Sequence, residues 1–436
     1  MTELRRALRL PHATALVVGT IIGASIFVQP SEITGAVPSV AGVLLVWTLA
    51  GALTLAGALV CAELASAFTR SGGVYVYLRE AFHPALGFLW GWAMFWVMHS
   101  GIIAAIAMVF ARYLGYFVPL GDWGTKLVAI GVIGVISGVN YLGVRPGSLL
   151  QATFTAGKVA AVLAIVVLGF ALGGRVPEHF VGPAAGHDPV TLRGMLTGLV
   201  AGLFAFGGWH MVTYNAEETV EPRRTIPRAL ILGTAIVTLC YIGMNAVYFY
   251  VLPFDRVAGS TRVAADAADA VLGSGGGAIL SGVVLFSTFG ALLGIVLMGP
   301  RVYYAMAEDG LLFAWAGAVH PRFRTPHLAI VLQGVWSAVL VASGTYRALF
   351  TRVVYTEWIF FGLMALGLIR LRRRGLSPEY RAPGFPLVPA VFALASFAIV
   401  INQVVRDPGE SLIGLSLVAA GWPVYVLWTR LGKRTR

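Results

Sequence analysis

Two ionisable side chains stand deep inside apolar segments, where they could hold a proton. Lys158 lies about nine residues, or roughly 14 Å, into its segment, close to the middle of a hydrocarbon core about 30 Å thick. Charges at that depth are costly and usually functional, so a lysine that snorkels or faces lipid is the weaker interpretation. Glu357 lies two or three helical turns into another segment, and a carboxylate near the outer rim is the alternative there. His99 and His210 could sense pH or touch a substrate, although satisfied core histidines are commoner.

Two segments are interrupted by glycine at matching places. The first reads VVGTIIGASIFVQP and the second TGLVAGLFAFGGWHM, about 183 residues further on, so that Gly19 and Gly23 correspond to Gly202 and Gly207. Paired interrupted segments indicate a transporter built from inverted repeats, with a binding site near the membrane midplane. Glycines that only permit close helix packing are the alternative, which two clusters at equivalent positions disfavour.

The elements that carry these residues must be membrane helices. Hydrophobic residues make up 58% of the 436 residues and charged residues 11%, against roughly 25% in an ordinary soluble chain. So few charges cannot cover a water-facing surface, which excludes a soluble fold and, despite the net charge of +12, a nucleic-acid partner. Alternating β-barrel patterning is absent, so the sequence predicts an all-α polytopic membrane protein with a single transporter domain, 1–436. Its twelve transmembrane helices are expected at 13–35, 40–68, 85–118, 126–143, 149–172, 194–216, 229–252, 276–306, 328–344, 348–369, 387–404 and 411–429.

The basic residues predict the orientation of these helices. Of the 31 Lys and Arg residues, 21 fall on one side of the predicted spans and nine on the other, with Lys158 inside a span. Because basic loops favour the cytoplasmic side, both termini are expected in the cytoplasm. The positive net charge is thus mostly a signature of topology.

Five groups of motifs follow one another along nearly the whole chain. They are GTIIGASIF on the first span, CAELASAF with TRSGGVYVYLREAF after the second, GLFAFGGWH with NAEETVEPRRTIPRAL at the sixth, FSTFGALLG on the eighth, and TEWIFFGL with LRRRGLSPEYRAPGFPLVPAVF around the tenth and eleventh. Together they resemble the APC superfamily of amino-acid transporters, and most closely its L-type amino-acid transporter (LAT) branch, prokaryotic members included. The resemblance implies the LeuT fold, with amino acids as substrates, alternating access, a 5+5 inverted repeat and discontinuous helices 1 and 6. The first repeat would cover 13–172 and the second 194–369, with two added helices at 387–429.

The resemblance also implies a substrate site at the two interruptions. Gly23, Ala24 and Ser25 would unwind the first span and bind the substrate carboxylate through backbone N–H groups. Relatives usually read GSG here, so Ala24 and Ser25 put the pocket volume in doubt and favour small or medium neutral substrates.

The second interruption would complete that site. Carbonyl groups of Ile21, Phe204 and Phe206 would take the substrate ammonium, and Gly207 would leave room for its side chain. Phe204 would be the aromatic lid on the outer side, with Trp209 as a further gate residue. Packing in the membrane core is the alternative for these aromatic side chains.

Lys158 gains a role from the same resemblance. In relatives that do not use sodium, a lysine at this place stands where the second sodium ion lies in sodium-coupled members. Its ammonium would tie the fifth span to the broken part of the first and to Ser287 or Thr288 on the eighth. Tyr241 matches a tyrosine that accompanies this lysine, although an ordinary buried tyrosine is equally expected. Transport is therefore expected to be sodium-independent, and either Lys158 or Glu357 could carry a coupled proton.

Charged side chains gather at the predicted cytoplasmic ends of the spans. They are the carboxylates of Glu63, Glu217 and Glu218 and the guanidinium groups of Arg70, Arg223 and Arg224. Ion pairs that close the inner side are one interpretation, and interfacial charges that only satisfy topology are the other. The segment Ser71–Phe82 is expected to form a short amphipathic helix in the inner interface.

These observations leave several functions in competition. An enzyme is disfavoured because the chain has no HExxH, no GxSxG and no His or Cys cluster with metal spacing, so no metal and no cofactor are expected. The favoured function is exchange of neutral L-amino acids. The alternatives are proton-coupled symport, transport of polyamines or cationic amino acids, and, outside the transporters, a channel or a non-transporting amino-acid sensor.

The positions of the two cysteines indicate whether the chain is expected to have a disulfide-linked partner. Cys61 and Cys240 both lie in apolar runs, and the loop VPLGDWGTK between the third and fourth spans has no cysteine for a disulfide-linked heavy chain. A stand-alone chain in a prokaryotic plasma membrane is therefore expected, with the lipid bilayer and amino acids as its partners.

Overall fold

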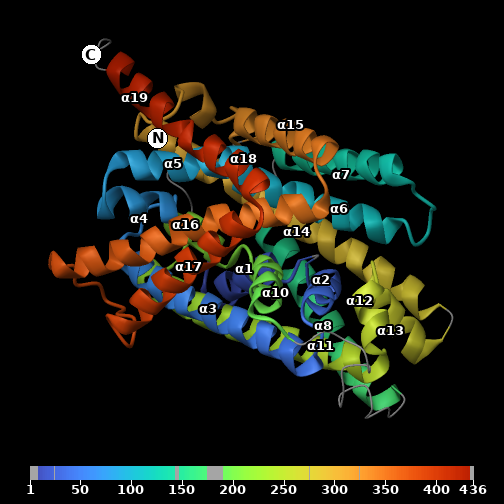
Figure 1. Cartoon of the computed structure of the whole chain (residues 1–436). Helices are drawn as coiled ribbons and strands as arrows, with labels where there is room; N and C mark the ends of the chain where they lie inside the picture. The colour runs from blue at the N-terminus through green and yellow to red at the C-terminus, as the bar shows by residue number, and fades with distance from the viewer. Residues whose placement is uncertain are drawn as a thin grey trace.

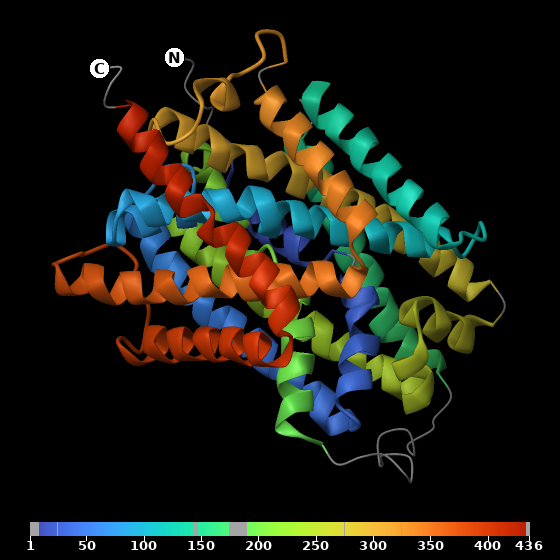
Figure 2. The ribbon, with the colours of Figure 1, turned by 45° about the horizontal axis from the view of Figure 1, so that its top comes forward.

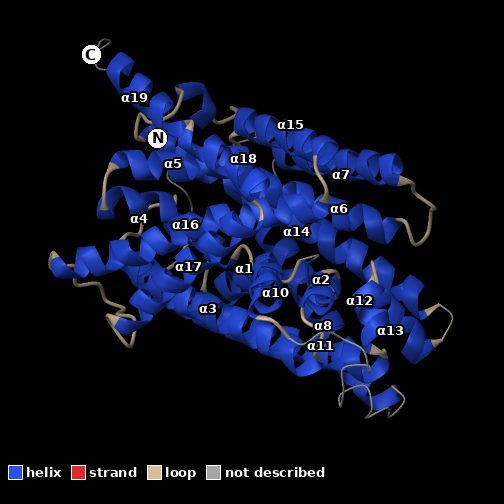
Figure 3. Ribbon diagram, viewed as in Figure 1, coloured by secondary structure: helices blue, strands red, loops and turns tan. Residues whose placement is uncertain are grey.

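A computed structural model describes residues 8–23, 25–142, 147–173, 190–273, 275–323 and 325–432, and Ala24 lies outside them. Within these residues every regular element is a helix (Figure 3), apart from a single bridge that pairs Leu8 with Thr219. The helices are α1 Leu10–Ile21, the 3₁₀ turn η1 Ser25–Phe27, α2 Gln29–Ala36, α3 Val40–Ala67, α4 Val74–Ala81, α5 Pro84–Ala93, the π-helical turn η2 Met94–Met98, α6 His99–Leu114, α7 Asp122–Leu142, α8 Gly147–Leu172, α10 Leu192–Ala205, the 3₁₀ segment η3 Trp209–Glu218, α11 Pro222–Val251, α12 Phe254–Gly259, α13 Val263–Leu272, α14 Gly276–Glu308, η4 Ala314–Gly317, α15 His327–Ser343, α16 Tyr346–Arg373, α17 Leu387–Arg406, α18 Pro408–Ala419 and α19 Gly421–Gly432.

The helices agree with the twelve predicted spans. Among the described residues, ten helices are long and apolar enough to cross a membrane, and Leu10–Ile21 and His327–Ser343 are shorter apolar helices. Each of the twelve falls on one predicted segment. Local sequence suffices for this because, in lipid, a helix must satisfy its own backbone hydrogen bonds.

The two interrupted helices lie in the middle of the bundle. Figure 1 shows α1 and α10 surrounded by the longer helices, and Figure 2 shows α16 and α17 running side by side at one flank. Helix α1 packs against α8, α11 and η3, whereas α10 packs against α2, α3 and α16. The predicted glycine-interrupted segments therefore share a central position.

Both interruptions form real breaks in these helices, as predicted. The first span stops at Ile21, continues as η1 and resumes as α2. The sixth stops at Ala205 and resumes at Trp209, with Gly208 between them at φ 92°. This left-handed conformation favours glycine, and a Cβ at Gly208 would lie only 3.3 Å from the carbonyl oxygen of Thr20. The second break thus requires glycine both for its backbone angle and for the close approach of the first span.

One predicted element differs in its surroundings. The segment Ser71–Phe82 contains the helix α4, but nearly all of its side chains are buried, including Tyr75 and Tyr77. It packs against α5 and α16, so other helices cover it and it is not an amphipathic helix with one free face. Glycines at positions 72 and 73, both with positive φ, lead the chain inward. The hydropathy pattern did not predict this burial, because it treats tyrosine as an interfacial residue whether or not other helices cover its side chain.

Candidate functional site

The breaks in the first and sixth spans surround a small central cavity. The volume of this cavity is about 10 Å³, which is roughly the room for a single water molecule. Its lining residues are Thr20, Ile21, Gly23, Ser25, Ile102, Ile106, Phe204, Gly207, Gly208, Met211 and Ile295. The structure therefore brings together the predicted residues Ile21, Gly23, Ser25, Phe204 and Gly207, in a closed state that must widen to admit an amino acid.

At the first break, backbone N–H groups, with partial positive charge, and carbonyl groups, with partial negative charge, lie beside this cavity. Ile22 leaves the helical conformation with ψ 80°, and η1 begins again at Ser25. The first N–H groups of a helical segment have no partner within it, so those around Ser25 suit a carboxylate. The carbonyl of Ile21 already accepts the N–H of Gly23 at 2.7 Å and the hydroxyl of Tyr241 at 2.9 Å. A substrate ammonium at Ile21 would thus compete with Tyr241.

Tyr241 on α11 links the two broken helices. Its fully buried hydroxyl lies 2.9 Å from the carbonyl oxygen of Ile21 and 3.1 Å from that of Ala205, the last residue of α10. Its ring contacts Phe206 with 5.1 Å between ring centroids, so the Phe206 side chain is directed away from the cavity. Tyr241 is therefore in contact with both ends at which the helices unwind.

Lys158 on α8 also contacts the first span. Its side chain is 2% exposed, and Nζ donates to the carbonyl of Gly19 at 3.2 Å. Thr288 on the eighth span is a predicted partner of Lys158. Its hydroxyl instead donates to the Val284 carbonyl of its own helix at 2.8 Å. The Ser287 hydroxyl is buried without a partner among the described residues and lines the same lateral cavity as Lys158.

An aromatic pair separates the central cavity from a larger outer one. The Phe204 ring lines the central cavity and lies 5.3 Å from the ring of Phe350 on α16, centroid to centroid. Phe350 in turn lines a cavity of about 320 Å³ on the face predicted to be extracellular, together with Glu32 and Arg406. Trp209 lies elsewhere, with its ring 5.1 Å from that of Phe361. Phe204 thus lies between the two cavities and Trp209 packs against Phe361, while the role of either as a gate stays a prediction.

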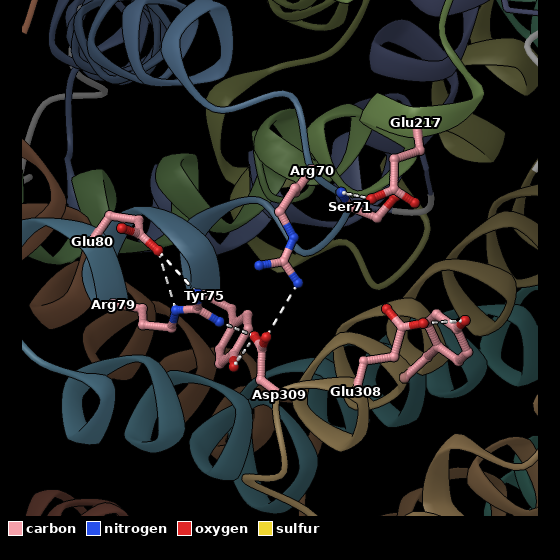
Figure 4. A network of polar contacts seen from close by, with 9 residues as sticks. Arg70, Ser71, Tyr75, Arg79, Glu80, Glu217, Glu308 and Asp309 are labelled. Atoms are coloured by element: carbon pink, nitrogen blue, oxygen red, sulfur yellow. Dashed lines mark hydrogen bonds and ion pairs between the residues drawn. The ribbon is translucent and has the colours of Figure 1, made fainter.

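A charged network gathers around Asp309, which directly follows the last residue of α14 (Figure 4). The Asp309 carboxylate accepts hydrogen bonds from Arg70 at 3.1 Å, from the Tyr75 hydroxyl at 2.7 Å and from Arg79. Burial raises the pKa of Asp309, but the hydrogen bonds from Arg79, Tyr75 and Arg70 outweigh it and leave the pKa below its usual range. Asp309 is therefore ionised at neutral pH and fastens the end of α14 to α4.

The predicted inner ion pairs form with other partners than their sequence neighbours. Glu63 pairs with Arg372 at 2.5 Å, and Glu218 pairs with Arg301 at 3.0 Å. Glu217 accepts the backbone N–H of Ser71 at 3.1 Å. Of the three arginines expected near these glutamates, Arg70 pairs with Asp309 and Arg224 pairs with Glu379. The carboxylates thus join parts of the chain that are far apart in sequence, on the side that is predicted to be the inner one.

A known protein family matches almost the whole length of this chain. The family model described as amino acid permease matches residues 8–427. This chain belongs to the amino acid permease family. The permease is 31% identical to the human b(0,+)-type amino acid transporter 1 over 98% of its own length and 88% of that protein. It is 30% identical to the serine/threonine exchanger SteT of Bacillus subtilis, over 97% of its own length and 96% of the relative. It is likewise 30% identical to the human cystine/glutamate transporter, over 100% of its own length and 87% of that protein.

These similarities give the permease its general function. The family and the relatives are transporters of amino acids, so the permease is a multi-pass membrane transporter of amino acids and not an enzyme. The broken helices and the all-helical bundle are consistent with the LeuT fold. Among the described residues, no group of three or more His, Cys, Asp or Glu side chains could hold a metal ion.

The sequence did not predict about half of the residues that line the central cavity. Apolar side chains of Ile102, Ile106, Met211 and Ile295 complete it, together with Thr20 and Gly208. In an apolar helix nothing distinguishes a cavity-lining isoleucine from a lipid-facing one, since both satisfy hydropathy. The Thr20 hydroxyl, which lies 3.3 Å from the Gly208 carbonyl, could have been suspected from its place between Gly19 and Gly23.

Proposed function

We propose that this permease exchanges neutral L-amino acids across the plasma membrane without sodium, as a chain that needs no disulfide-linked partner. The observation that carries the proposal is the buried ammonium of Lys158, 3.2 Å from the Gly19 carbonyl on the broken span. When Lys158 is protonated, its positive charge would supply what a bound cation would supply between α8 and α1. A sodium ion close to it would be repelled in a low-dielectric surrounding.

The lining of the central cavity supports a neutral substrate. Its side chains are aliphatic, aromatic or hydroxyl-bearing, and none of the residues that line it carries a charge. The substrate carboxylate and ammonium would meet backbone groups at the two breaks. A charged substrate side chain would instead face Ile106, Met211 or Ile295, where burying it unpaired is costly.

Exchange is supported by analogy as well as by geometry. One relative is named a serine/threonine exchanger, and it matches along nearly the whole of both chains. In an exchanger the empty carrier reorients slowly. Here the tightly closed cavity, with Phe204 on one side and the Asp309 network on the other, is compatible with that behaviour.

The test is counterflow in proteoliposomes with sodium replaced by choline. Labelled L-alanine, L-serine, L-threonine, L-leucine and L-arginine are offered outside, with and without the unlabelled amino acid inside. We expect uptake of a neutral amino acid to require internal substrate and to ignore sodium. Sodium-dependent uptake, or uptake of L-arginine alone, would contradict the proposal.

Lys158 is tested in the same vesicles. Lys158→Met keeps the length of the side chain but removes its charge, and we expect the exchange rate to fall at least tenfold because the tie to Gly19 is lost. Lys126→Met is the matched control, since that ammonium bonds the Ala342 carbonyl at an exposed position. Equal rates for wild type and Lys158→Met would show that the ammonium does not take the place of an ion.

A further inference from the structure

Helix α14 carries a proline in its interior, just beyond the wall of the central cavity. Ile295 lines that cavity, and Pro300 follows it five residues later on the same helix. Proline has no backbone N–H, so the carbonyl four residues earlier, that of Val296, loses its usual donor within the helix. The hydrogen bonding of α14 is therefore interrupted at the residue that directly follows Ile295.

A glutamine from another helix reaches that carbonyl. Nε2 of Gln333 on α15 donates to the Val296 carbonyl oxygen in a long hydrogen bond of 3.4 Å, and the Gln333 side chain is fully buried. An amide nitrogen can only donate and a carbonyl oxygen can only accept, so the two groups are complementary. The glutamine thus supplies a donor at the place where Pro300 removes one.

A histidine reaches the preceding carbonyl. Nε2 of His99 on α6 lies 2.8 Å from the Ile295 carbonyl oxygen, and the imidazole is buried. Because a carbonyl oxygen can only accept, Nε2 carries the hydrogen. Two successive carbonyl groups of α14 therefore receive donors from two other helices, and the first of them belongs to a residue of the cavity wall.

Gly299 lets both donors approach α14. A Cβ at this position would lie 2.3 Å from Oε1 of Gln333 and 2.6 Å from Nε2 of His99. Both distances are shorter than real Cβ contacts, so a side chain here would displace one group or the other. The glutamine and the histidine therefore converge on one place on α14, which only glycine leaves open.

The carbonyl after Val296 also receives a side-chain donor. Nη1 of Arg301 lies 3.0 Å from the Leu297 carbonyl oxygen on the same helix. The guanidinium pairs at the same time with Glu218, the last residue of η3, at 3.0 Å. Side chains thus donate to three successive carbonyl groups beside Pro300, which shows that the backbone here is held by contacts outside the regular helix.

These contacts determine the position of one wall of the substrate cavity. The cavity is so small that a slight displacement of Ile295 changes the room that is left for a substrate side chain. A buried carbonyl that loses its donor must move towards another donor or stay unsatisfied, which is costly. Loss of the Gln333 amide would therefore shift the backbone at Val296, and Ile295 with it.

We propose that Gln333 is a positioning residue for the selection of the substrate side chain. It gives the Val296 carbonyl the hydrogen bond that Pro300 denies it, and so holds Ile295 at the cavity wall. Gln333 itself does not line the cavity. The inference rests on the proposed function and deepens it, because it concerns which neutral side chains the same cavity admits. A loosened wall would favour larger amino acids.

The test compares two substitutions, alone and together, in the full chain in proteoliposomes. Gln333→Met keeps the length of the side chain but removes the amide, whereas Pro300→Ala returns an N–H to the backbone. The readout is the ratio of the inhibition constants of L-alanine and L-leucine against counterflow of labelled L-serine, or of whichever amino acid of the panel above gives the largest counterflow. A loss of folded protein leaves this ratio unchanged, because both inhibitors act on the same molecules.

We expect Gln333→Met to strengthen inhibition by L-leucine relative to L-alanine by about fivefold or more. The same substitution should have no such effect in the Pro300→Ala background, where the Val296 carbonyl has a backbone donor again. Pro227→Ala is the matched control, because Pro227 also lies inside a helix, α11, but its replacement gives no donor to Val296. Gln333→Met should keep its full effect in that background.

Melting temperatures of the detergent-solubilised variants give a second readout that needs no transport. Gln333→Met should lower the melting temperature in the wild-type and Pro227→Ala backgrounds but not in the Pro300→Ala background. The comparison is a double-mutant cycle, so it measures the dependence of one position on the other and not the stability of either variant alone.

Two outcomes would overturn the inference. One is an unchanged ratio of the inhibition constants in Gln333→Met. The other is an effect of Gln333→Met that is equally large with and without Pro300→Ala, which would mean that the glutamine supports packing and not the carbonyl. Failure of wild-type counterflow with every amino acid would instead defeat the proposed function, and the melting temperatures would then decide whether Gln333 replaces the missing N–H.

Discussion

At the scale of single residues, Tyr241 shows how one side chain can join two broken helices. Its hydroxyl is within hydrogen-bond distance of the last carbonyl groups before both breaks, those of Ile21 and Ala205. Tyr248, two turns further along the same helix, is equally buried, but its hydroxyl has no partner among the described residues. The two tyrosines therefore differ in hydrogen bonding and not in burial.

We expect Tyr241→Phe to lower the free energy of unfolding by about 1–3 kcal/mol, because it leaves buried carbonyl groups short of a donor. Tyr248→Phe should be nearly neutral, since the hydroxyl that it removes satisfies no group. Thermal unfolding of both purified variants in one detergent measures the difference. Equal melting temperatures would show that the hydrogen bonds at the two breaks contribute little.

At the scale of elements, contacts between α4 and the end of α14 hold together the side that is predicted to be the inner one. Asp309 receives three donors, of which Arg79 and Tyr75 come from α4 and Arg70 from the segment before it (Figure 4). Arg70 is 47% exposed, so its share is reduced by solvent screening. Together these contacts are expected to favour the closed inner side by about 1–2 kcal/mol, or roughly 5- to 30-fold in population.

Asp309→Asn should therefore raise the inward-open population by that factor. The readout is alkylation of Thr213→Cys, a buried position on η3, in a chain whose two native cysteines are replaced. Glu80→Gln is the control, because Glu80 pairs with Arg79 on its own helix and not with α14. No change in alkylation rate for Asp309→Asn would mean that packing alone keeps this side closed.

The same network predicts the pH dependence of the inner closure. The pKa of Asp309 is lowered in the folded protein, so its stabilising effect is complete above the ordinary carboxyl pKa and is lost only as the pH falls below it. The ratio of the alkylation rates of Thr213→Cys with Asp309 intact and with Asp309→Asn should accordingly be flat between about pH 6 and 8, because the thiolate fraction changes equally in both.

At the scale of the whole molecule, the residues predicted on each side of the membrane do meet one another. On the predicted inner side, Leu8 N–H donates to the Glu218 carbonyl at 3.0 Å and the Trp428 indole donates to the Gly310 carbonyl at 2.8 Å. On the other side, Arg406 donates to the Thr197 hydroxyl. Each of these contacts thus joins residues that the prediction places on the same side of the membrane.

Which face is cytoplasmic is a prediction that labelling can test. A membrane-impermeant maleimide added to intact cells should label Asp122→Cys but not Arg374→Cys, because the basic loops favour the cytoplasm. Permeabilising the cells should expose the second position. The reverse pattern would invert the topology, while Cys61 and Cys240 are buried and should stay silent in both cases.

The sequence by itself determined the membrane class, the twelve segments, the two glycine interruptions and the depth of Lys158. These are local properties, because each helix in lipid must satisfy its own backbone and cover itself with apolar side chains. The tertiary structure alone decided that Lys158 meets Gly19, that Glu63 pairs with Arg372 across more than 300 residues, and that Tyr75 and Tyr77 are buried. Such contacts depend on how each helix is rotated about its axis, and in a helix that is apolar on all sides the hydropathy pattern carries no record of that rotation.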